Sequence, residues 1–231
     1  MRISGLQKLT ALDFPDRLAC TVFTPGCNLR CPFCHNASLV LKNAEDYNID
    51  EFFSFLKKRT GVLDGVCITG GEPLLQPGIE EFISKIRELG YLVKLDTNGA
   101  FPDKLESIIS KGLVDYVAMD IKNSPEKYPA SCGIDKNSED FLLPFKKSIA
   151  LLLQNKVDYE FRTTVVEELH DISDIEKAGE LIRGARRWNL QCFKDSGDLI
   201  SSGFSSPTKQ KLEQMRKIAL GFCDSCDIRG V

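Results

Sequence analysis

Residues 24–36 read TPGCNLRCPFCHN, and the three cysteines of this stretch are the most informative feature of the chain. Cys27, Cys31 and Cys34 are separated by three and then by two residues. Thiolates held this close together repel one another unless they share a metal, and cysteine thiolate is the usual ligand of zinc and of iron–sulfur clusters. Zinc normally takes its ligands in two pairs, whereas no partner pair lies near this loop. The spacing therefore favours an iron–sulfur cubane with three irons held by cysteine and one iron left open.

Other chemistries are compatible with part of this loop. Residues 31–35 match the C-x-x-C-H pattern of covalent haem attachment, which normally requires export, and the sequence shows no export signal. Cys31 and Cys34 also have the spacing of a thiol–disulfide pair, but that role would leave Cys27 idle. Zinc, a redox pair and inert cysteines therefore remain open as alternatives to the cluster.

The composition is that of a globular protein in a reducing compartment. The 231 residues fall within the range of a single α/β domain, and a hydrophobic content of 42% supports a sizeable core. The net charge is −3 and no polybasic run occurs, so we expect no nucleic-acid partner. We also expect no membrane association and a cytoplasmic location, because the sequence shows neither a membrane-length apolar run nor a signal peptide. Nine cysteines in such a chain argue against a disulfide framework.

Strand-like and helix-like patterns alternate along the chain. Six short strands, rich in apolar and β-branched residues, are expected at 18–23, 65–70, 91–96, 114–121, 157–166 and 190–193. Apolar residues recur at helical spacing in 49–56, 79–89, 105–113, 141–152, 175–182 and 207–218, and a loop is expected at 123–137. Pro144 favours a start of the fourth helix after that residue, and Ser206-Pro207 favours the start of the last one. The alternation predicts a parallel sheet, either an open partial barrel or a doubly wound sheet.

Polar residues follow several of these predicted strands. The relevant segments are Gly70-Gly71-Glu72-Pro73, Asp96-Thr97-Asn98-Gly99 and Asp120-Ile121-Lys122, with Arg162 and Thr164 in the fifth strand and Gln191 in the sixth. Because the carboxyl ends of parallel strands meet at one edge of a sheet, we expect these residues to converge over the cysteine loop. Each segment alone has an ordinary alternative, such as a tight turn, a turn cap or a solvent-exposed ion pair.

The remaining cysteines and the second histidine have simpler interpretations. Free cysteine is readily buried, so four cysteines are predicted to be core or loop thiols: Cys20, Cys67, Cys132 and Cys192. Cys223 and Cys226 form a C-x-x-C pair without evident further ligands, and we predict that they are inert, although zinc or redox roles stay open. His170 follows Glu168-Leu169 near a predicted loop and is expected at the surface.

The cysteine spacing, with Phe33 before the last cysteine, resembles the signature of the radical S-adenosylmethionine (SAM) superfamily. The extension His35-Asn36 is similar to that of the activating enzymes of glycyl-radical enzymes. The resemblance covers roughly residues 10–230. It implies a partial (β/α)6 barrel and a single domain over 1–231, with the cluster loop at 24–36 and a core at about 18–220. It also implies a [4Fe–4S] cluster on Cys27, Cys31 and Cys34, whose open iron is chelated by SAM.

The resemblance also implies a SAM site at the strand ends. The candidate residues are Phe33, Cys34 and His35 beside the adenine, Gly70, Gly71 and Glu72 at the amino group, Asp120 and Lys122 at the carboxylate, and further Asp96 and Asn98. A monovalent cation near Asp96, Thr97 and Asp120 is a further expectation. Many pyruvate formate-lyase activating enzymes place a histidine on the sixth strand for the ribose, and this chain has none there, which leaves Gln191 as the candidate.

The implied function is the generation of a glycyl radical on a partner enzyme. The resemblance is greatest to the activating proteins of anaerobic ribonucleoside-triphosphate reductase, with flavodoxin or ferredoxin as the expected electron donor. The alternatives are a pyruvate formate-lyase-type activase, a radical SAM enzyme that acts on a small molecule, and a non-catalytic zinc or thiol-redox module.

Overall fold

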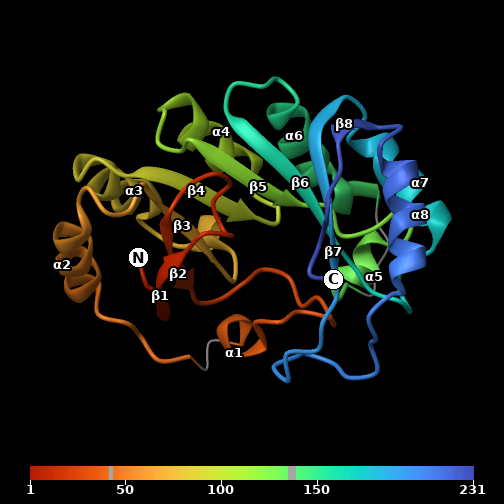
Figure 1. Cartoon of the computed structure of the whole chain (residues 1–231), viewed down its shortest axis with the longest axis horizontal. Coiled ribbons are helices and arrows are strands. Elements are labelled where there is room, and N and C mark those ends of the chain that lie inside the picture. Colours follow the sequence, from red (N-terminus) through yellow and green to blue (C-terminus); the bar gives the residue numbers. More distant parts are fainter. Residues whose placement is uncertain (42–43, 135–138) are drawn as a thin grey trace.

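The computed structural model describes residues 1–41, 44–134 and 139–231, which form a curved sheet with helices around its outer side (Figure 1). The strands are β1 (Gly5–Thr10), β2 (Ala19–Thr24), β3 (Gly65–Gly70), β4 (Leu92–Thr97), β5 (Tyr116–Asp120), β6 (Asp158–Val165), β7 (Ala185–Cys192), β8 (Cys223–Ser225) and β9 (Ile228–Arg229). The α-helices are α1 (Ala37–Val40), α2 (Ile49–Arg59), α3 (Ile79–Glu88), α4 (Pro102–Ser110), α5 (Tyr128–Ser131), α6 (Leu143–Leu152), α7 (Ile172–Leu181) and α8 (Lys209–Ala219). Two 3₁₀ turns, η1 (Pro73–Leu75) and η2 (Glu139–Leu142), complete the described elements.

The six predicted parallel strands are confirmed. Strands β2 to β7 lie side by side in sequence order, and each pair of neighbours is parallel. The connections between them run through helices on the outer side, as parallel pairing requires. The sheet does not close on itself, which confirms the partial barrel. No helix in the described parts of the chain is long and apolar enough to cross a membrane.

Several element boundaries differ from the sequence prediction. The edge strands β1, β8 and β9 were not predicted: β1 pairs antiparallel with β2 and is largely exposed, so it lacks the apolar alternation of a half-buried strand. Helix α6 begins before Pro144, which occupies the first turn where its missing N–H costs nothing. Helix α8 begins at Lys209, because the Thr208 side chain caps it. The expected loop at 123–137 contains α5, and its residues 135–137 lie outside the described residues.

The two faces of the sheet have opposite character because side chains alternate along each strand. Val66 and Ile68 of β3, like Val93 and Leu95 of β4, are fully buried beneath the outer helices. Helix α3 covers this side with a buried stripe: Ile79, Phe82, Ile83 and Ile86. The apolar core therefore lies between the sheet and its helices, and the alternate positions of each strand point into the barrel.

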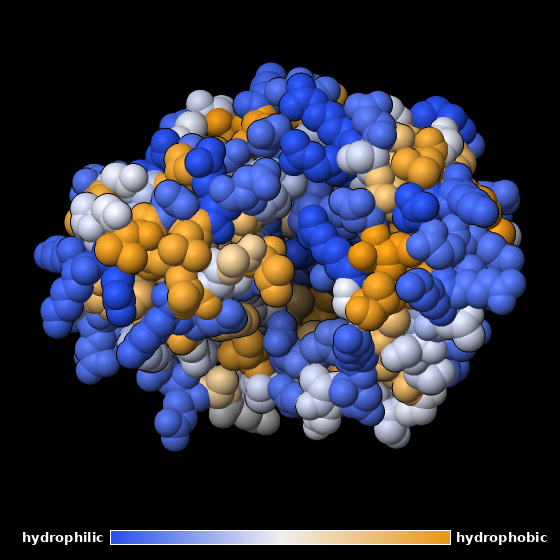
Figure 2. Space-filling model, in the orientation of Figure 1, coloured by the Kyte–Doolittle hydropathy of each residue, from blue (hydrophilic) through white to orange (hydrophobic). Residues whose placement is uncertain are grey.

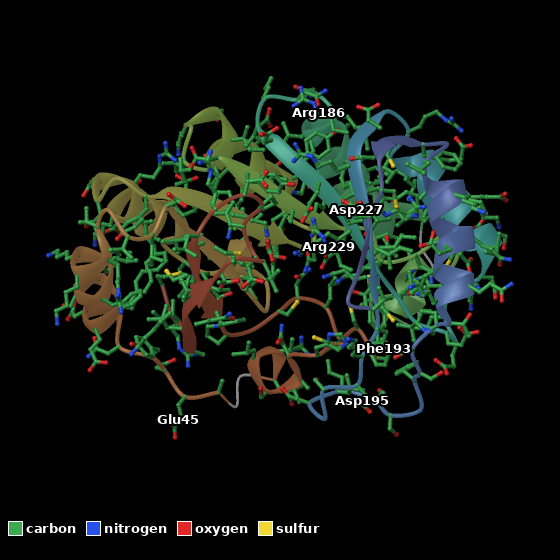
Figure 3. The ribbon with its side chains drawn as sticks, in the orientation of Figure 1. Glu45, Arg186, Phe193, Asp195, Asp227 and Arg229 are labelled. Atoms are coloured by element: carbon green, nitrogen blue, oxygen red, sulfur yellow. The ribbon has the colours of Figure 1, made fainter. Side chains whose placement is uncertain are left out.

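The inside of the partial barrel is polar. Glu160 of β6 is 1% exposed and accepts hydrogen bonds from Asn189 of β7 (2.7 Å) and from both terminal nitrogens of Arg229 (3.0 and 2.7 Å). Arg229 comes from β9 beside β7, so the last strand extends the barrel wall (Figure 3). Figure 2 shows a hollow in this face that is open to solvent and bordered by both hydrophilic and hydrophobic residues. Phe14 packs on Tyr116 at the opposite, amino-terminal end of the strands.

Candidate functional site

The cysteine loop follows the carboxyl end of β2 and is held by backbone hydrogen bonds. The Gly26 amide donates to the Leu39 carbonyl (2.7 Å), and the Cys34 amide donates to the Cys31 carbonyl (3.0 Å). Cys31 is buried, Cys27 and Cys34 are half-buried, and all nine cysteines are free thiols. The three loop cysteines line one cavity of about 220 Å³ at the carboxyl ends of the strands. The structure thus brings the predicted ligand set to one place.

Cys27, Cys31 and Cys34 all line this one cavity. Within the described ranges, no three His, Cys, Asp or Glu side chains are placed to hold a single metal ion. The cysteines of a [4Fe–4S] cluster each hold a different iron, so they do not need to meet at a single metal ion. Three cysteine thiols at one cavity are a donor set that fits such a cluster.

The thiols differ in their readiness to ionise. Burial raises the pKa of Cys27 to about 11 and also raises the pKa of Cys34. A hydrogen bond from the Cys132 thiol, assisted by the Lys122 ammonium, lowers the pKa of Cys31 below its usual value. Metal ligation requires thiolates, so loading this loop must displace protons from at least Cys27 and Cys34 at neutral pH.

Gly70 and Gly71 let the end of β3 lie directly against the cysteine loop. The Gly71 amide donates to the Thr24 carbonyl (2.8 Å), and the Glu72 amide donates to the Gly26 carbonyl (2.9 Å). A β-carbon on Gly71 would lie 2.0 Å from the Gly26 carbonyl oxygen, far inside contact distance. Both glycines also line the cavity. Their absence of side chains is therefore required by backbone packing whether or not a ligand approaches them.

Glu72 lies behind the cavity wall and does not line it, unlike the other twelve residues predicted for the site. Its carboxylate is fully buried and accepts hydrogen bonds from the Leu74 amide (3.0 Å), the Thr97 hydroxyl (2.9 Å) and the Asn98 amide (2.7 Å). Burial outweighs these three donors and raises the pKa of Glu72 to about 7. In this structure Glu72 joins η1 to the turn after β4, so it positions Asn98 from behind.

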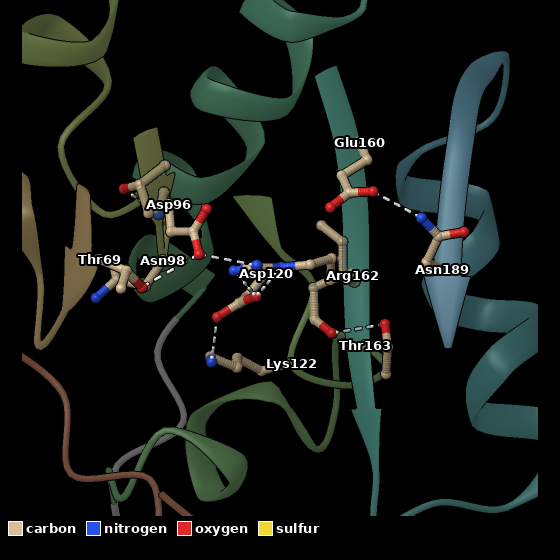
Figure 4. Close-up of polar contacts among 12 residues, drawn as sticks. Thr69, Asp96, Asn98, Asp120, Lys122, Glu160, Arg162, Thr163 and Asn189 are labelled. Carbon is tan, nitrogen blue, oxygen red and sulfur yellow. Dashed lines mark hydrogen bonds and ion pairs between the residues drawn. The ribbon is translucent and has the colours of Figure 1, made fainter. Parts of the chain in front are cut away.

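An ion network spans β4, β5 and β6 at the cavity floor (Figure 4). Arg162 pairs with Asp96 (2.9 Å) and with Asp120 (3.1 Å), and Lys122 pairs with Asp120 (2.8 Å). Lys94, fully buried, makes a further ion pair with Asp96. Burial alone would raise the pKa of Asp96, but Arg162 and Lys94 hold it at about 2. Burial likewise opposes ionisation of Lys122, yet Asp120 raises the pKa of Lys122 well above its usual value.

These ion pairs bear on the predicted monovalent cation. The network contains three positive and two negative side chains, so Asp96 and Asp120 are already neutralised. Thr97, the third predicted ligand, donates its hydroxyl to Glu72. The arrangement does not favour a cation there, and the cation stays a prediction.

The other wall of the cavity comes from the cysteine loop and β7. His35 packs against Phe193 with ring centroids 5.1 Å apart, and Asn36 donates its side-chain amide to the Gly70 carbonyl (3.3 Å). Within the part of the chain that the structure describes, the Nε2 atom of His35 is buried and meets no hydrogen-bond partner. Phe33 and Gln191 complete this wall. A polar atom left unpaired inside a cavity fits a ligand with hydrogen-bonding groups.

Sequence reasoning missed some functional positions and misplaced one. Arg162 and Thr164 were expected at the strand ends, but no role was assigned to them. Lys94 and Thr69 were not predicted, although both contact Asp96, as Arg162 does. The alternation of polar residues along each strand was the signal that could have indicated them. The prediction that His170 lies at the surface is wrong, because it is 1% exposed. Cys20, Cys67 and Cys132 are buried as predicted, and Cys192 is half-buried. Cys223 and Cys226 are also buried, and the Cys223 thiol donates to the Ala219 carbonyl (3.2 Å).

Comparison with known proteins shows the family of the chain. Residues 21–175 match the family model described as the radical SAM superfamily. The chain is 32% identical to MJ1227 of Methanocaldococcus jannaschii, described as a candidate glycyl-radical enzyme activating enzyme, over 99% of this chain and 96% of that protein. It is 28% identical to the pyruvate formate-lyase-activating enzyme of Clostridium pasteurianum, over 80% of this chain and 77% of that enzyme.

Solved structures with low sequence identity share the fold. A radical SAM methyltransferase from Sphaerobacter thermophilus matches with a TM-score of 0.72 and 13% identity, over 96% of this chain and 68% of that one. A domain of a pyruvate-formate lyase-activating enzyme from Bacteroides vulgatus matches with a TM-score of 0.57 and 19% identity, over 72% of this chain and 99% of that domain. At these identities the likeness supports the architecture and not the reaction.

Proposed function

The chain belongs to the radical SAM superfamily, and from this premise we propose that it generates a glycyl radical on a partner enzyme. The cofactors of the superfamily are a [4Fe–4S] cluster and SAM. The relatives that match 99% and 80% of the chain are described as activating enzymes, which favours an enzyme over a non-catalytic zinc or thiol-redox module.

One observation carries the proposal: a single cavity is lined by the three loop thiols and by the charged ends of the neighbouring strands. Cys27, Cys31 and Cys34 would hold the cluster and leave one iron open. When bound, the cluster supplies one electron to the sulfonium of SAM, which then breaks into methionine and a 5′-deoxyadenosyl radical. The protein binds and orients these groups and keeps water away from them.

The cavity residues divide into roles by their chemistry. The Lys122 ammonium suits the carboxylate of SAM, because a charge-assisted hydrogen bond to a carboxylate is stronger than a neutral one. Backbone carbonyls near Gly70 and Gly71 suit its ammonium group. Phe33 and His35 are proposed to border the adenine, and Gln191, which lines the same cavity, is proposed to contact the ribose.

The open hollow supports a protein substrate over a small molecule (Figure 2). A glycine in a chain segment must reach the cavity from outside, and no described element caps the hollow on this face. We propose anaerobic ribonucleoside-triphosphate reductase as the partner, because β7 carries Gln191 where many pyruvate formate-lyase activating enzymes have a histidine. The likeness to the Clostridium pasteurianum enzyme favours a pyruvate formate-lyase-type enzyme as the second candidate. A flavodoxin or ferredoxin would supply the electron.

The test is anaerobic reconstitution followed by electron paramagnetic resonance (EPR). The protein is loaded with iron and sulfide, reduced, and mixed with SAM and each candidate partner. We expect near four irons per chain and a glycyl doublet that requires SAM and reductant, with one partner only. The Cys31→Ala variant should lose the cluster and the doublet, whereas Cys223→Ala, which alters a buried thiol outside the cavity, should keep both. One zinc and no iron in the wild-type protein would refute the proposal.

A further inference from the structure

His170 is buried beside the site, although the cavity does not touch it. It lies at the end of the segment between β6 and α7, two residues before α7 begins, and its side chain is 1% exposed. Its amide donates to the Val166 carbonyl (3.0 Å), which closes a tight turn after the strand. A histidine buried this deeply must satisfy both ring nitrogens with protein partners.

The partners of His170 fix its tautomer. Nδ1 lies 3.1 Å from the Val166 amide and 3.3 Å from the Val166 carbonyl, so this residue alone does not place the proton. A neutral ring carries one proton, and the Lys122 carbonyl requires it on Nε2, so Nδ1 carries the lone pair and accepts from the Val166 amide. The Lys122 carbonyl can only accept, and it lies 2.9 Å from Nε2, so Nε2 carries the proton. Burial also lowers the pKa of His170, which keeps the ring neutral. The imidazole therefore accepts a hydrogen bond from the Val166 amide, just after β6, and donates one to the backbone carbonyl of Lys122.

The segment after β5 is held at each residue around Lys122. The Ile121 amide donates to the Arg162 carbonyl (2.7 Å), and its carbonyl accepts from the Thr163 hydroxyl (2.8 Å). The Asn123 side chain donates to the Leu169 carbonyl (3.1 Å). The bond from His170 completes this set at the Lys122 carbonyl itself. A lysine side chain has four rotatable bonds, so its ammonium can be directed only if its backbone is fixed.

His170 also contacts the cysteine loop. Its ring meets Phe33 edge-on, with ring centroids 6.4 Å apart and an angle of 78° between the planes. Phe33 lies between Cys31 and Cys34 in the sequence and is 4% exposed. One imidazole thus touches the two segments that form opposite sides of the cavity.

We propose that His170 is a positioning residue for SAM binding. As a neutral Nε2–H imidazole it contacts both the Lys122 backbone and the Phe33 ring, and so fixes their positions relative to each other. The inference rests on the proposed function, because it assigns the Lys122 ammonium to the SAM carboxylate. His170 touches no ligand and acts only through these two residues.

Two amide substitutions separate the two hydrogen bonds of the ring. Glutamine places an amide nitrogen near the position of Nε2, so His170→Gln can still donate to the Lys122 carbonyl. Asparagine reaches only the position of Nδ1. His170→Asn can therefore accept a hydrogen bond from the Val166 amide but cannot donate one to the Lys122 carbonyl. His170→Leu keeps bulk and removes both bonds. Tyr91→Phe is the matched control, because it removes another buried donor to a carbonyl, that of Leu56 (2.7 Å), far from the cavity.

The measurement is the SAM dissociation constant of each anaerobically reconstituted variant, together with the change that SAM causes in the EPR spectrum of the reduced cluster. We expect His170→Gln and Tyr91→Phe to bind SAM within about threefold of wild type, and His170→Asn and His170→Leu to bind at least tenfold more weakly, with an altered spectrum. Unfolding midpoints, measured in parallel, should fall in all four variants.

The outcomes distinguish the inference from the function on which it rests. If loaded wild-type protein does not bind SAM, the proposed function is wrong. If wild type binds SAM and the Asn and Leu variants bind it equally well, the role of His170 is refuted. Should those two variants fail to fold, the Gln variant decides: SAM affinity reduced tenfold there would equally refute the role, and retained affinity would support it.

Discussion

Adding one methyl group to Gly71 tests whether the contact between β3 and the cysteine loop sets the geometry of the site. The residue has no positive φ, so Gly71→Ala introduces no backbone strain of its own. Its β-carbon would lie 2.0 Å from the Gly26 carbonyl oxygen and 2.6 Å from the Gly26 carbonyl carbon. The substitution therefore acts through a single steric contact with the residue before Cys27.

The displacement can be worked out from these distances. Ordinary contact begins near 3.4 Å, so the loop must move by at least 3.4 minus 2.0, or 1.4 Å. Gly26 is anchored at both ends of its peptide, by its bond to Leu39 (2.7 Å) and by the Glu72 amide (2.9 Å). Breaking two buried backbone hydrogen bonds costs about 2–5 kcal/mol. A misplacement of about 1 Å near reacting groups lowers a rate by roughly 100-fold.

The assay compares iron content, SAM cleavage and unfolding in Gly71→Ala and in a matched control. Gly61→Ala has a positive φ of 77° and nothing within 4 Å of the new β-carbon, so it adds strain without a clash. We expect Gly61→Ala to lose about 1 kcal/mol of stability and keep its full iron. Gly71→Ala should lose iron and at least 100-fold in SAM cleavage. Full iron and a wild-type cleavage rate in Gly71→Ala would refute the steric argument.

Three further predictions concern the charged and amide groups of the site. Lys122→Met should weaken SAM binding by roughly 10- to 100-fold, measured on the reconstituted protein, because a hydrogen bond to a charged group is worth about 1.5–3 kcal/mol. Asn98→Asp should lower the reduction potential of the cluster, followed by EPR-monitored redox titration, because it replaces an amide donor 3.7 Å from the Cys27 sulfur with a negative oxygen. The pKa of Glu72 is about 7 in the folded protein and about 4.5 in the unfolded chain, so the unfolding free energy of wild type should fall as the pH rises from about 4.5 to 7. Glu72→Gln should remove this pH dependence, as measured by urea denaturation at each pH.

The part of the site that sequence could predict is the part that depends on topology alone. Once six strands alternate with helices, the parallel arrangement follows, and the residues after each strand must meet at one edge. Gly70, Asp96, Asp120 and Gln191 were placed correctly by this rule, and all four line the cavity with the cysteines. No knowledge of strand register or of side-chain direction was needed for that step.

What sequence could not predict depends on pairing between segments. Strand β1 and the short strands β8 and β9 carry little apolar alternation, because they are edge strands whose stability comes from their neighbours. His170 was expected at the surface because it follows Glu168-Leu169 near a predicted loop. Its burial follows from contacts with Lys122 and Phe33, which are distant in the sequence.

The charge balance of the cavity floor is a consequence of register and bears directly on the ligand. Arg162 lies opposite Asp120 in the pairing of β5 with β6, and its side chain also reaches Asp96 on the next strand but one. The network therefore contains two carboxylates and three cationic side chains, those of Lys94, Lys122 and Arg162. Its excess positive charge lies at the cavity, where the Lys122 side chain is 16% exposed. A sodium or potassium ion would add to that excess, whereas a ligand carboxylate would offset it. For this reason the network supports Lys122 as the carboxylate-binding group and does not require a monovalent cation beside it.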